Sequence, residues 1–335
     1  MKRRSGLPGE FEIIGRYFAP LSFGFAGAFD LTDDVAVIAP GAGQELVVKT
    51  DAIVGGMHFM SDDSPDLVAR KALRVNLSDL AAKGAVPRAY MLALILPDTT
   101  AEAWVAEFAR GLAEDQSAYG VHLIGGDTDM TPGPVTIAIM AFGVVPTGQV
   151  LRRNGARAGD TIFVTGTIGD AALGVKALRG ELAGLDPQAA EHLVDRYRLP
   201  RPRVSLGPRL LNLATATIDI SDGLVADLRH VCEASGVDAV VQAPLVPLSA
   251  AASFAGNLRP EHIQTVLTGG DDYEILFTAP IGAAGELARL SRAMNVPITA
   301  IGRIEQASAE RPGQVSVIDA QGRPFKLEHE GWTHF

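Results

Sequence analysis

Apolar positions along the first half of the chain form short runs of strand length and longer amphipathic stretches. The short runs predict strands at residues 45–50, 90–96, 121–124 and 135–145. The amphipathic stretches predict helices at residues 66–83 and 101–119. Because strands and helices do not alternate strictly along the chain, α+β layering fits the pattern better than a doubly wound parallel sheet.

The second half shows the same mixture of periods. It predicts a strand at 161–165, a helix at 170–179, a helical, loop-rich stretch to about residue 209, a strand at 217–220, a helix at 222–235, a strand at 272–278, a helix at 282–295 and a strand at 298–304. Between the halves, Pro146-Thr-Gly-Gln149 and Arg152-Arg153-Asn154-Gly155 interrupt the apolar periodicity. We therefore expect two domains, residues 1–148 and 149–335.

Length and composition restrict the class of protein. With 335 residues and 47% hydrophobic content, the chain is long enough for about two domains with sizeable cores. A charged fraction of 20%, without a long polar tract, argues against disorder. The formal charge of -10 has the wrong sign for attraction to a nucleic-acid backbone, so we expect no nucleic-acid partner.

The cysteine count and the N-terminus indicate the compartment. The single cysteine, Cys232, excludes an internal disulfide and a cysteine-based metal site, which favours a reducing compartment. The basic start Lys2-Arg3-Arg4 is not followed by the apolar run of a signal peptide. No apolar segment reaches the roughly 18 residues that a membrane-spanning helix needs. We therefore expect a soluble cytoplasmic protein without a membrane partner.

Carboxylates collect at the ends of the predicted apolar segments. They are Asp33, Asp34, Asp51, Asp79 and Asp127 in the first half, and Asp219, Asp222, Asp271 and Asp272 in the second. A single Asp beside Gly is more often a turn former or a helix cap. However, so many acids without a matching set of bases would repel one another unless cations lie between them, and oxygen ligands select hard ions such as Mg²⁺.

Magnesium held by carboxylates most often serves phosphate chemistry, so the acidic set predicts a nucleotide ligand. The chain lacks the glycine-rich motifs of P-loop and Rossmann nucleotide sites. Two glycine turns remain, Gly125-Gly126 before Asp127 and Gly166 with Gly169 before a helix. The backbone amides of such turns can meet phosphate directly.

Nine segments along the chain form a recognisable set: 9–11 (GEF), 32–36 (TDDVA), 50–51 (TD) with 56–59 (GMHF), 71–85 (KALRVNLSDLAAKGA), 124–128 (IGGDT), 159–166 (GDTIFVTG), 218–224 (IDISDGL), 269–274 (GGDDYE) and 331–335 (GWTHF). Taken in this order, they resemble the thiamine-monophosphate kinase family over nearly the whole chain.

The resemblance implies a fold and an activity. The family belongs with the aminoimidazole ribonucleotide synthetase-like enzymes, which have two α+β domains, with mixed or antiparallel sheets and helices packed on one side. Residues 1–148 would bind ATP and magnesium and form a homodimer through their sheets, and residues 149–335 would complete an active site in the cleft between the domains. The implied reaction transfers the γ-phosphoryl group of ATP to thiamine monophosphate, directly in line, with several Mg²⁺ ions and no covalent enzyme intermediate.

The resemblance also implies roles for individual residues. Catalytic roles fall to Asp51, Asp79, Asp127 and Asp219. The implied magnesium ligands are Asp34, Thr50, Asp51, Asp79, Asp127, Asp219 and Asp222. ATP contacts match Gly126, Asp127, Arg153 and Ser221, and thiamine phosphate contacts match His58, Asp271 and Trp332. Plain alternatives stay open for three of them: a loop histidine at His58, a solvated arginine at Arg153 and a packing residue at Trp332.

The sequence departs from the family pattern at four positions. Asp30 and Thr32 stand where the first acidic loop usually has glycines, which affects the backbone path. Lys49 stands where a Ser or Thr usually precedes Thr50, and its side chain would compete with a cation. Asp271 replaces a glutamate, which shortens that carboxylate arm.

Two kinds of alternative stay open. An aminoimidazole ribonucleotide synthetase or a selenophosphate synthetase would also use ATP and magnesium, but the latter needs a reactive Cys or selenocysteine in its N-terminal region, and the one Cys here is Cys232. Against the former stands the pairing of the 269–274 and 331–335 segments. The second kind is a nucleotide-binding or metal-sensing module that has lost turnover, which would bind ATP without forming product.

Overall fold

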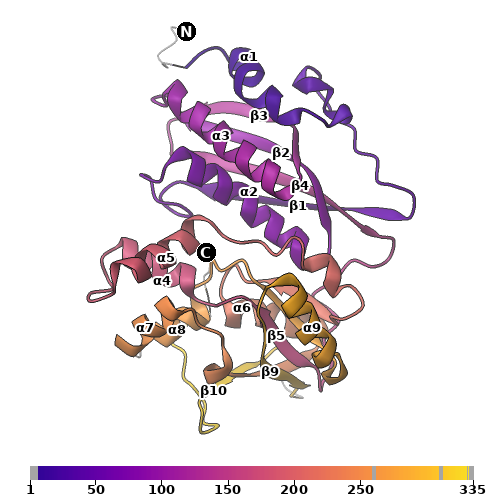
Figure 1. The fold of residues 1–335 in the computed structure, drawn as a ribbon, viewed down its shortest axis with the longest axis vertical. Coiled ribbons are helices and arrows are strands. Elements are labelled where there is room, and N and C mark those ends of the chain that lie inside the picture. Colours follow the sequence, from indigo (N-terminus) through magenta and orange to yellow (C-terminus); the bar gives the residue numbers. More distant parts are fainter. Residues whose placement is uncertain (1–6, 259–261, 309–311, 330, 332–335) are drawn as a thin grey trace. The chain divides into compact units, whose positions relative to one another are not determined.

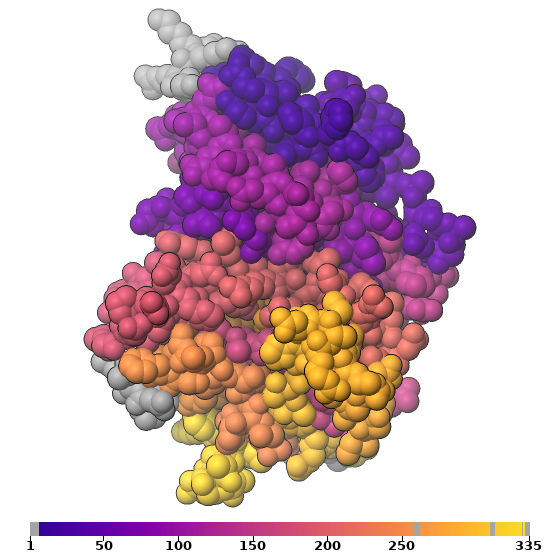
Figure 2. Space-filling view, viewed as in Figure 1, coloured from indigo at the N-terminus to yellow at the C-terminus, as the bar shows by residue number. Residues whose placement is uncertain are grey.

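The computed structural model describes residues 7–258, 262–308, 312–329 and 331 (Figure 1). The chain folds as two compact units. The first unit lies within Met1–Leu80 and Ala85–Gly148, and the second lies within Ala81–Gly84 and Gln149–Phe335. In Figure 2, the indigo to magenta surface belongs to the first unit, and the pink to yellow surface belongs to the second unit. Among the described residues, none of the helices combines the length and the apolar character that crossing a lipid bilayer requires.

The first unit contains a four-stranded sheet in the order β1 (Gln44–Val54), β4 (Thr136–Pro146), β2 (Val86–Pro97) and β3 (His122–Thr131). β1 and β2 both run antiparallel to β4, and β3 runs parallel to β2. The N-terminal elements are α1 (Glu10–Ile13), η1 (Ile14–Phe18), η2 (Ala19–Ser22) and η3 (Ala26–Leu31). The long helices α2 (Pro65–Ala82) and α3 (Glu102–Tyr119) run over one face of the sheet (Figure 1).

Successive side chains of β2 point to opposite faces of the sheet, and a hydrogen bond from Tyr90 identifies the face that meets these helices. The Tyr90 hydroxyl donates to Gln116 Oε1 in α3 at 2.8 Å, so Tyr90 and its buried same-face neighbour Leu92 face the helix layer. Within that layer, Arg74 binds Asp115 through two hydrogen bonds, with Nε 2.6 Å from Oδ2. This buried pair joins α2 to α3.

The opposite face of the first sheet is only partly covered. Ala89 and Phe142 pack there against Ala28 of η3. Val48 is the partner of Phe142 in the register, and Met140 lies two residues before Phe142, so both share this face. Val48 and Met140 are 53% and 40% exposed, which leaves an apolar part of the face open.

The second unit contains a six-stranded sheet in the order β10 (Val315–Ile318), β7 (Val237–Gln242), β9 (Ile298–Gln306), β5 (Thr161–Thr165), β8 (Ile275–Ala279) and β6 (Ala216–Asp219). Its neighbours are antiparallel except β10 and β7, which are parallel. The α-helices are α4 (Asp170–Leu178), α5 (Pro187–Arg198), α6 (Leu224–Ser235), α7 (Ala250–Leu258), α8 (His262–Thr268) and α9 (Ala284–Met294). Short helical turns are η4 (Gly207–Leu210), η5 (Ala243–Leu245) and η6 (Ile281–Ala283).

Both faces of this sheet carry an apolar core, because successive residues of a buried strand point to opposite sides. Ile162 of β5 and Leu228 of α6 belong to one core. Phe163 of β5 and Phe277 of β8 stack in the other, with ring centroids 5.3 Å apart, and Leu287 of α9 packs with them. The second sheet therefore has α9 on the face opposite to α6.

Cys232 of α6 is buried in the core that contains Ile162. Burial, together with the negative charges of Asp238 and Glu233, raises the pKa of the Cys232 thiol to about 12. Because the thiolate is the reactive form of cysteine, this thiol is inert near neutral pH.

The α+β class predicted from the sequence is confirmed, and several strands, among them β1, β2 and β3, are longer than predicted. β3 continues past the predicted range of 121–124, and its pairing with β2 shifts by one residue between Tyr90 and Met91. The bulged strand passes so close to β2 that a Cβ on Gly126 would lie 1.8 Å from the Leu92 carbonyl oxygen. The glycines that predicted a turn thus serve a close approach of two strands.

Candidate active site

Strand β1 and helix α2 bring together three charged residues of the first unit. Lys49 Nζ lies 2.9 Å from Asp79 Oδ2 and 3.1 Å from Asp51 Oδ2. Lys49 and Asp51 are two residues apart on β1, so they share a face of the strand. Their partners in β4, Ala141 and Ile139, are buried, which places them on the face that the helices cover.

Asn76 ties the strand to the helix at this point. Its Oδ1 accepts the backbone N–H of Asp51 at 3.0 Å, and its Nδ2 donates to the Ala72 carbonyl at 3.0 Å. Asn76 and Asp79 are three residues apart, so a helix presents both on one face. Sequence reasoning misses Asn76, although its spacing from Asp79 is the signal that would have found it.

The neighbours of Lys49 keep it charged. Burial alone would lower the pKa of the Lys49 ammonium group, but the Asp79 and Asp51 carboxylates outweigh burial and raise that pKa above its ordinary value. Lys49 is therefore a permanent cation at neutral pH, in contact with two acids that the resemblance assigns to magnesium.

Thr50 and His58 lie on and just after β1. Thr50 is exposed and lies opposite Met140 in the register, on the other side of the strand from Lys49. His58 lies in the turn that follows β1, and its Nδ1 accepts the Val54 N–H at 3.0 Å. That hydrogen bond fixes the orientation of the imidazole ring.

Asp34 and Asp127 lie on separate segments. Asp127 follows Gly126 on β3, Asp34 lies in the irregular segment after η3, and both are exposed. Within the described ranges, no three His, Cys, Asp or Glu side chains lie close enough together to hold a metal ion. The oxygen-only donor set suits Mg²⁺, but the Lys49 ammonium group already contacts Asp51 and Asp79, the two acids that the first unit brings together.

Two loops of the second unit pack backbone against backbone. The loop after β6 contains Ser221, and the loop before β8 contains Asp271. The Asp271 N–H donates to the Ser221 carbonyl at 2.8 Å, and the Tyr273 N–H donates to the Ile220 carbonyl at 2.8 Å. A Cβ on Gly270 would lie 2.3 Å from the Ser221 carbonyl oxygen, so this approach requires glycine.

The other predicted acids of the second unit lie in the same two loops. Asp219 is the last residue of β6 and is buried, whereas Asp222 is partly exposed. Asp271 has a φ of +64°, and its Oδ1 accepts the Tyr273 hydroxyl at 3.0 Å. The structure therefore brings four predicted residues to one end of the second sheet: Asp219, Ser221, Asp222 and Asp271.

Asp227, which sequence reasoning misses, organises the loop before α6. Its Oδ2 accepts the backbone N–H groups of Ser221, Asp222 and Gly223 at 3.0, 3.0 and 3.1 Å. Gly223 has a φ of +125°, so α6 begins at Leu224 and not at the predicted residue 222. Burial and the charge of Asp222 raise the pKa of Asp227 to about 7, although the three N–H donors favour its charged form.

Arg153 lies apart from this group. Its carbonyl accepts the Ser235 hydroxyl at 2.9 Å at the C-terminal end of α6, whereas Ser221 precedes the N-terminal end. A 12-residue helix is about 18 Å long, so the backbone of Arg153 is well separated from Ser221. The remaining predicted residue, Trp332, lies outside the described residues.

A second acid that sequence reasoning misses is Glu274, the last residue of the 269–274 segment. Glu274 is fully buried and accepts hydrogen bonds from Arg203 Nε at 2.6 Å, Thr165 Oγ1 at 2.6 Å and Arg196 Nη2 at 3.0 Å. A Cβ on Gly166 would lie 2.1 Å from Glu274 Oε1, which explains the glycine after β5. Glu274 thus anchors the loop that carries Asp271.

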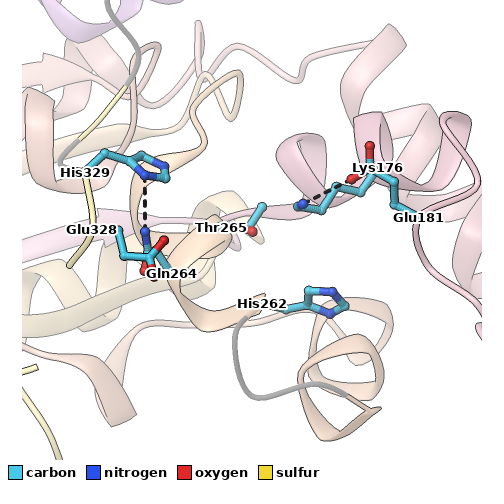
Figure 3. Close-up of a pocket in the computed structure, with 7 residues that line it drawn as sticks. All are labelled: Lys176, Glu181, His262, Gln264, Thr265, Glu328 and His329. Atoms are coloured by element: carbon cyan, nitrogen blue, oxygen red, sulfur yellow. Dashed lines mark hydrogen bonds and ion pairs between the residues drawn. The ribbon is translucent and has the colours of Figure 1, made fainter. Parts of the chain in front are cut away.

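A pocket of about 540 Å³ opens elsewhere in the second unit (Figure 3), and it is lined by Lys176, Glu181, His262, Gln264, Thr265, Glu328 and His329. Two pairs of its side chains bind each other. Lys176 Nζ lies 3.2 Å from Glu181 Oε2, and Gln264 Nε2 lies 3.2 Å from His329 Nδ1. None of the predicted site residues lines this pocket, so we do not place the active site there.

Comparison with known proteins decides the family. Residues 32–145 match the model of the AIR synthase related protein, N-terminal domain, and residues 157–312 match that of the C-terminal domain. The thiamine-monophosphate kinase of Escherichia coli K12 is 41% identical over 329 residues, which are 98% of each chain. The thiamine-monophosphate kinase of Caulobacter vibrioides is 39% identical and covers 98% of this chain and 91% of its own. This chain belongs to the thiamine-monophosphate kinase family.

Solved structures agree with the family membership. The thiamine-monophosphate kinase from Stenotrophomonas maltophilia is 40% identical, with a TM-score of 0.77 over 86% of this chain and 89% of its own. A structure described as AaThiL complexed with AMPPCP and TMP is 30% identical, with a TM-score of 0.77 over 89% of both chains. The two-domain α+β architecture of the family is therefore confirmed for this chain.

This member of the family builds its first acidic loop without the usual glycines. Phe29, Asp30 and Leu31 have φ values of +52°, +54° and +54°. This left-handed conformation costs an L-residue about 1–2 kcal/mol, whereas glycine adopts it freely. Asp30, which stands where the resemblance implies a glycine, keeps a backbone conformation suited to glycine and carries the strain.

Replacing Asp30 with glycine is expected to raise the free energy of unfolding by about 0.5–1 kcal/mol, because relief of the left-handed strain exceeds the entropy that glycine loses on folding. The measurement is urea unfolding followed by circular dichroism. Asp33→Gly is the matched control, since Asp33 lies in the same loop without a positive φ, and it should lower the free energy by about 0.5–1 kcal/mol. A lower free energy of unfolding in both variants would contradict the proposed backbone strain at Asp30.

The raised pKa of Asp227 predicts a pH dependence of stability. Between its ordinary value of 3.8 and about 7, the folded protein holds a proton that the unfolded chain has lost. The free energy of unfolding should therefore fall as pH rises through this window, by up to about 1.4 kcal/mol per pH unit relative to Asp227→Asn. Urea unfolding from pH 4 to 8 in EDTA measures the difference. The exposed control Asp62→Asn should keep the wild-type slope, and parallel curves for wild type and Asp227→Asn would refute the prediction.

Proposed function

We propose that this chain catalyses the ATP-dependent phosphorylation of thiamine monophosphate to thiamine diphosphate. The γ-phosphoryl group passes directly in line from ATP to the acceptor phosphate, without a covalent enzyme intermediate. The observation that carries the proposal is the match to AaThiL, complexed with AMPPCP and TMP, over 89% of both chains. AMPPCP is an analogue of ATP, so that complex contains counterparts of both proposed reactants.

The chemistry of the predicted residues suits this reaction. Both reactants carry several negative charges on groups that must approach each other in line, so positive charge has to be gathered between them. The acceptor is a phosphate monoester with a second pKa of about 6, so it is already ionised near neutral pH and needs no strong general base. No cysteine nucleophile is needed either, in keeping with the burial and raised pKa of Cys232.

We assign catalytic roles to Asp51, Asp79, Asp127 and Asp219. Bound Mg²⁺ ions, held by these acids with Asp34, Thr50 and Asp222, would offset the negative charge that builds up on the phosphoryl oxygens.

Ser221 and His58 have geometry suited to their proposed roles. The Ser221 N–H already donates to Asp227, so its hydroxyl is the group left for an ATP phosphate. His58 Nδ1 accepts the Val54 N–H, so the neutral ring carries its proton on Nε2, which can donate to an oxygen of thiamine phosphate.

Four assignments remain, two for residues that would contact ATP and two for residues that would contact thiamine phosphate. Gly126 would contact ATP through its backbone, and the Arg153 guanidinium would stabilise charge on the polyphosphate. Asp271 and Trp332 would contact thiamine phosphate, the indole through stacking and cation-π contacts with the thiamine rings.

We also propose a cytoplasmic homodimer formed through the sheets of the first units. The exposure of Val48 and Met140 on the open sheet face supports it, because contiguous exposed apolar side chains are typical of an interface. Size-exclusion chromatography with light scattering should give twice the chain mass of 35.2 kDa, and a monomer at micromolar concentration would refute the dimer. We propose ATP and thiamine monophosphate as the other partners, and no nucleic acid or membrane.

The test is incubation of the purified protein with ATP, Mg²⁺ and thiamine monophosphate, followed by chromatography. Equal amounts of thiamine diphosphate and ADP are expected, with no product from thiamine or in the presence of EDTA. ATP binding without product would overturn the proposal in favour of a binding module. Product from a different phosphate acceptor alone would favour a sister enzyme of the same fold.

A further inference from the structure

The Lys49 ammonium group contacts both acids that meet between β1 and α2. Lys49 Nζ is 2.9 Å from Asp79 Oδ2 and 3.1 Å from Asp51 Oδ2. The family pattern has a Ser or Thr at this position, which carries no charge. This chain therefore places a cation of its own where the family pattern has only a small hydroxyl group.

The surroundings hold this contact in place. The side chains of Lys49 and Asp79 are only 28% and 17% exposed. Beside them, the buried Asn76 fixes β1 to α2 through the backbone N–H of Asp51. Exposed ion pairs open readily in solvent, whereas the Lys49–Asp79 pair is partly covered and lies between two restrained segments.

A divalent cation that bridges the same two oxygens conflicts with Lys49. Mg²⁺ binds carboxylate oxygens at about 2.0–2.1 Å and keeps an octahedral shell around it. An ion between Asp51 Oδ2 and Asp79 Oδ2 would overlap the ammonium group or lie a few ångströms from it, where like charges repel strongly. Lys49 also neutralises part of the negative charge that would attract the ion.

We propose that Lys49 takes the place of one divalent cation of the family's site, so that this protein binds one ion fewer between Asp51 and Asp79 than it would with Ser at position 49. The inference rests on the proposed function only in treating these two acids as metal ligands. The fixed ammonium supplies one positive charge there at any metal concentration, and the remaining predicted ligands keep their role.

The test counts bound ions without turnover. Metal-free protein is titrated with Mn²⁺, which takes the same hard oxygen ligands as Mg²⁺, and free Mn²⁺ is measured by electron paramagnetic resonance with no nucleotide present. Lys49→Ser and Lys49→Met should each bind one more Mn²⁺ per chain than the wild type. Lys49→Arg, which keeps the cation, and Lys176→Ser, which removes a lysine of the second unit, should match the wild type.

Equal Mn²⁺ counts in the wild type, Lys49→Ser and Lys49→Met, whether several ions or none, would overturn the inference. Circular dichroism shows whether each variant is folded, and two different neutral substitutions guard against one that is not. Because the titration needs no substrate, the two proposals fail separately. A chain that forms no thiamine diphosphate but gains an ion in Lys49→Ser loses the proposed function alone, whereas an active chain with equal counts loses only this inference.

Discussion

Replacing Glu274 with Gln is expected to lower the free energy of unfolding by about 3–5 kcal/mol. The carboxylate is fully buried and binds Arg196 and Arg203 together with the Thr165 hydroxyl. A neutral amide would remove the buried negative charge that Arg196 and Arg203 both contact, and it would turn its own N–H₂ toward other donors. Arg196 Nη1 already lacks a hydrogen-bond partner among the described residues, so the site has no spare acceptor.

Urea unfolding followed by circular dichroism measures this loss. The matched control is Glu286→Gln in the first turn of α9, where the side chain is exposed and the change should stay within about 0.5 kcal/mol. Similar small effects in both variants would mean that water replaces the lost carboxylate, which would contradict the burial of the Glu274 network.

Replacing Asp51 with Asn is expected to lower kcat/KM for thiamine monophosphate by about a thousandfold while the fold stays intact. The substitution removes one of the two negative charges that contact Lys49. In the proposed reaction, Asp51 is one of the acids that hold Mg²⁺. Stability should change little, because the Asp51 side chain is 43% exposed and Lys49 keeps its contact with Asp79.

Steady-state kinetics and a thermal unfolding curve test both halves of this expectation. Asp98→Asn is the control, since it removes an exposed carboxylate of the same unit that has no assigned role. Wild-type kcat/KM in Asp51→Asn would remove Asp51 from the proposed site. A collapse of the unfolding temperature would instead make Asp51 a structural residue.

The apolar pattern predicts the elements that carry many buried positions, and it misses two short strands. α2 and β2 carry enough buried positions for their periods to be visible, and the structure places them close to the predicted ranges. β7 and β10 are short, and each is paired with a strand far along the chain, Ala239 with Val315 in the register. Their ladder hydrogen bonds leave no periodic signal in the sequence.

The motifs identify the family, but they do not show which residues touch. The pairing of Lys49 with Asp51 and Asp79 depends on α2 packing against β1, which no local spacing reveals. Asn76 and Asp227 act through bonds to backbone N–H groups, so their roles become visible only once those groups are placed. The available clue is their position: Asn76 lies within the 71–85 segment, and Asp227 lies just beyond the 218–224 segment.

Because the sequence contains a single cysteine, the protein is well suited to site-specific labelling through introduced thiols. Cys232 is buried in the core of the second unit, and its thiol has a raised pKa. Maleimides should therefore not react with Cys232 in the folded protein. A cysteine introduced at an exposed position, such as Asp98→Cys in the first unit or Glu286→Cys in the second, would carry the label alone. A fluorophore at each of these two positions would then report directly on any movement of the units when ATP and thiamine monophosphate are added.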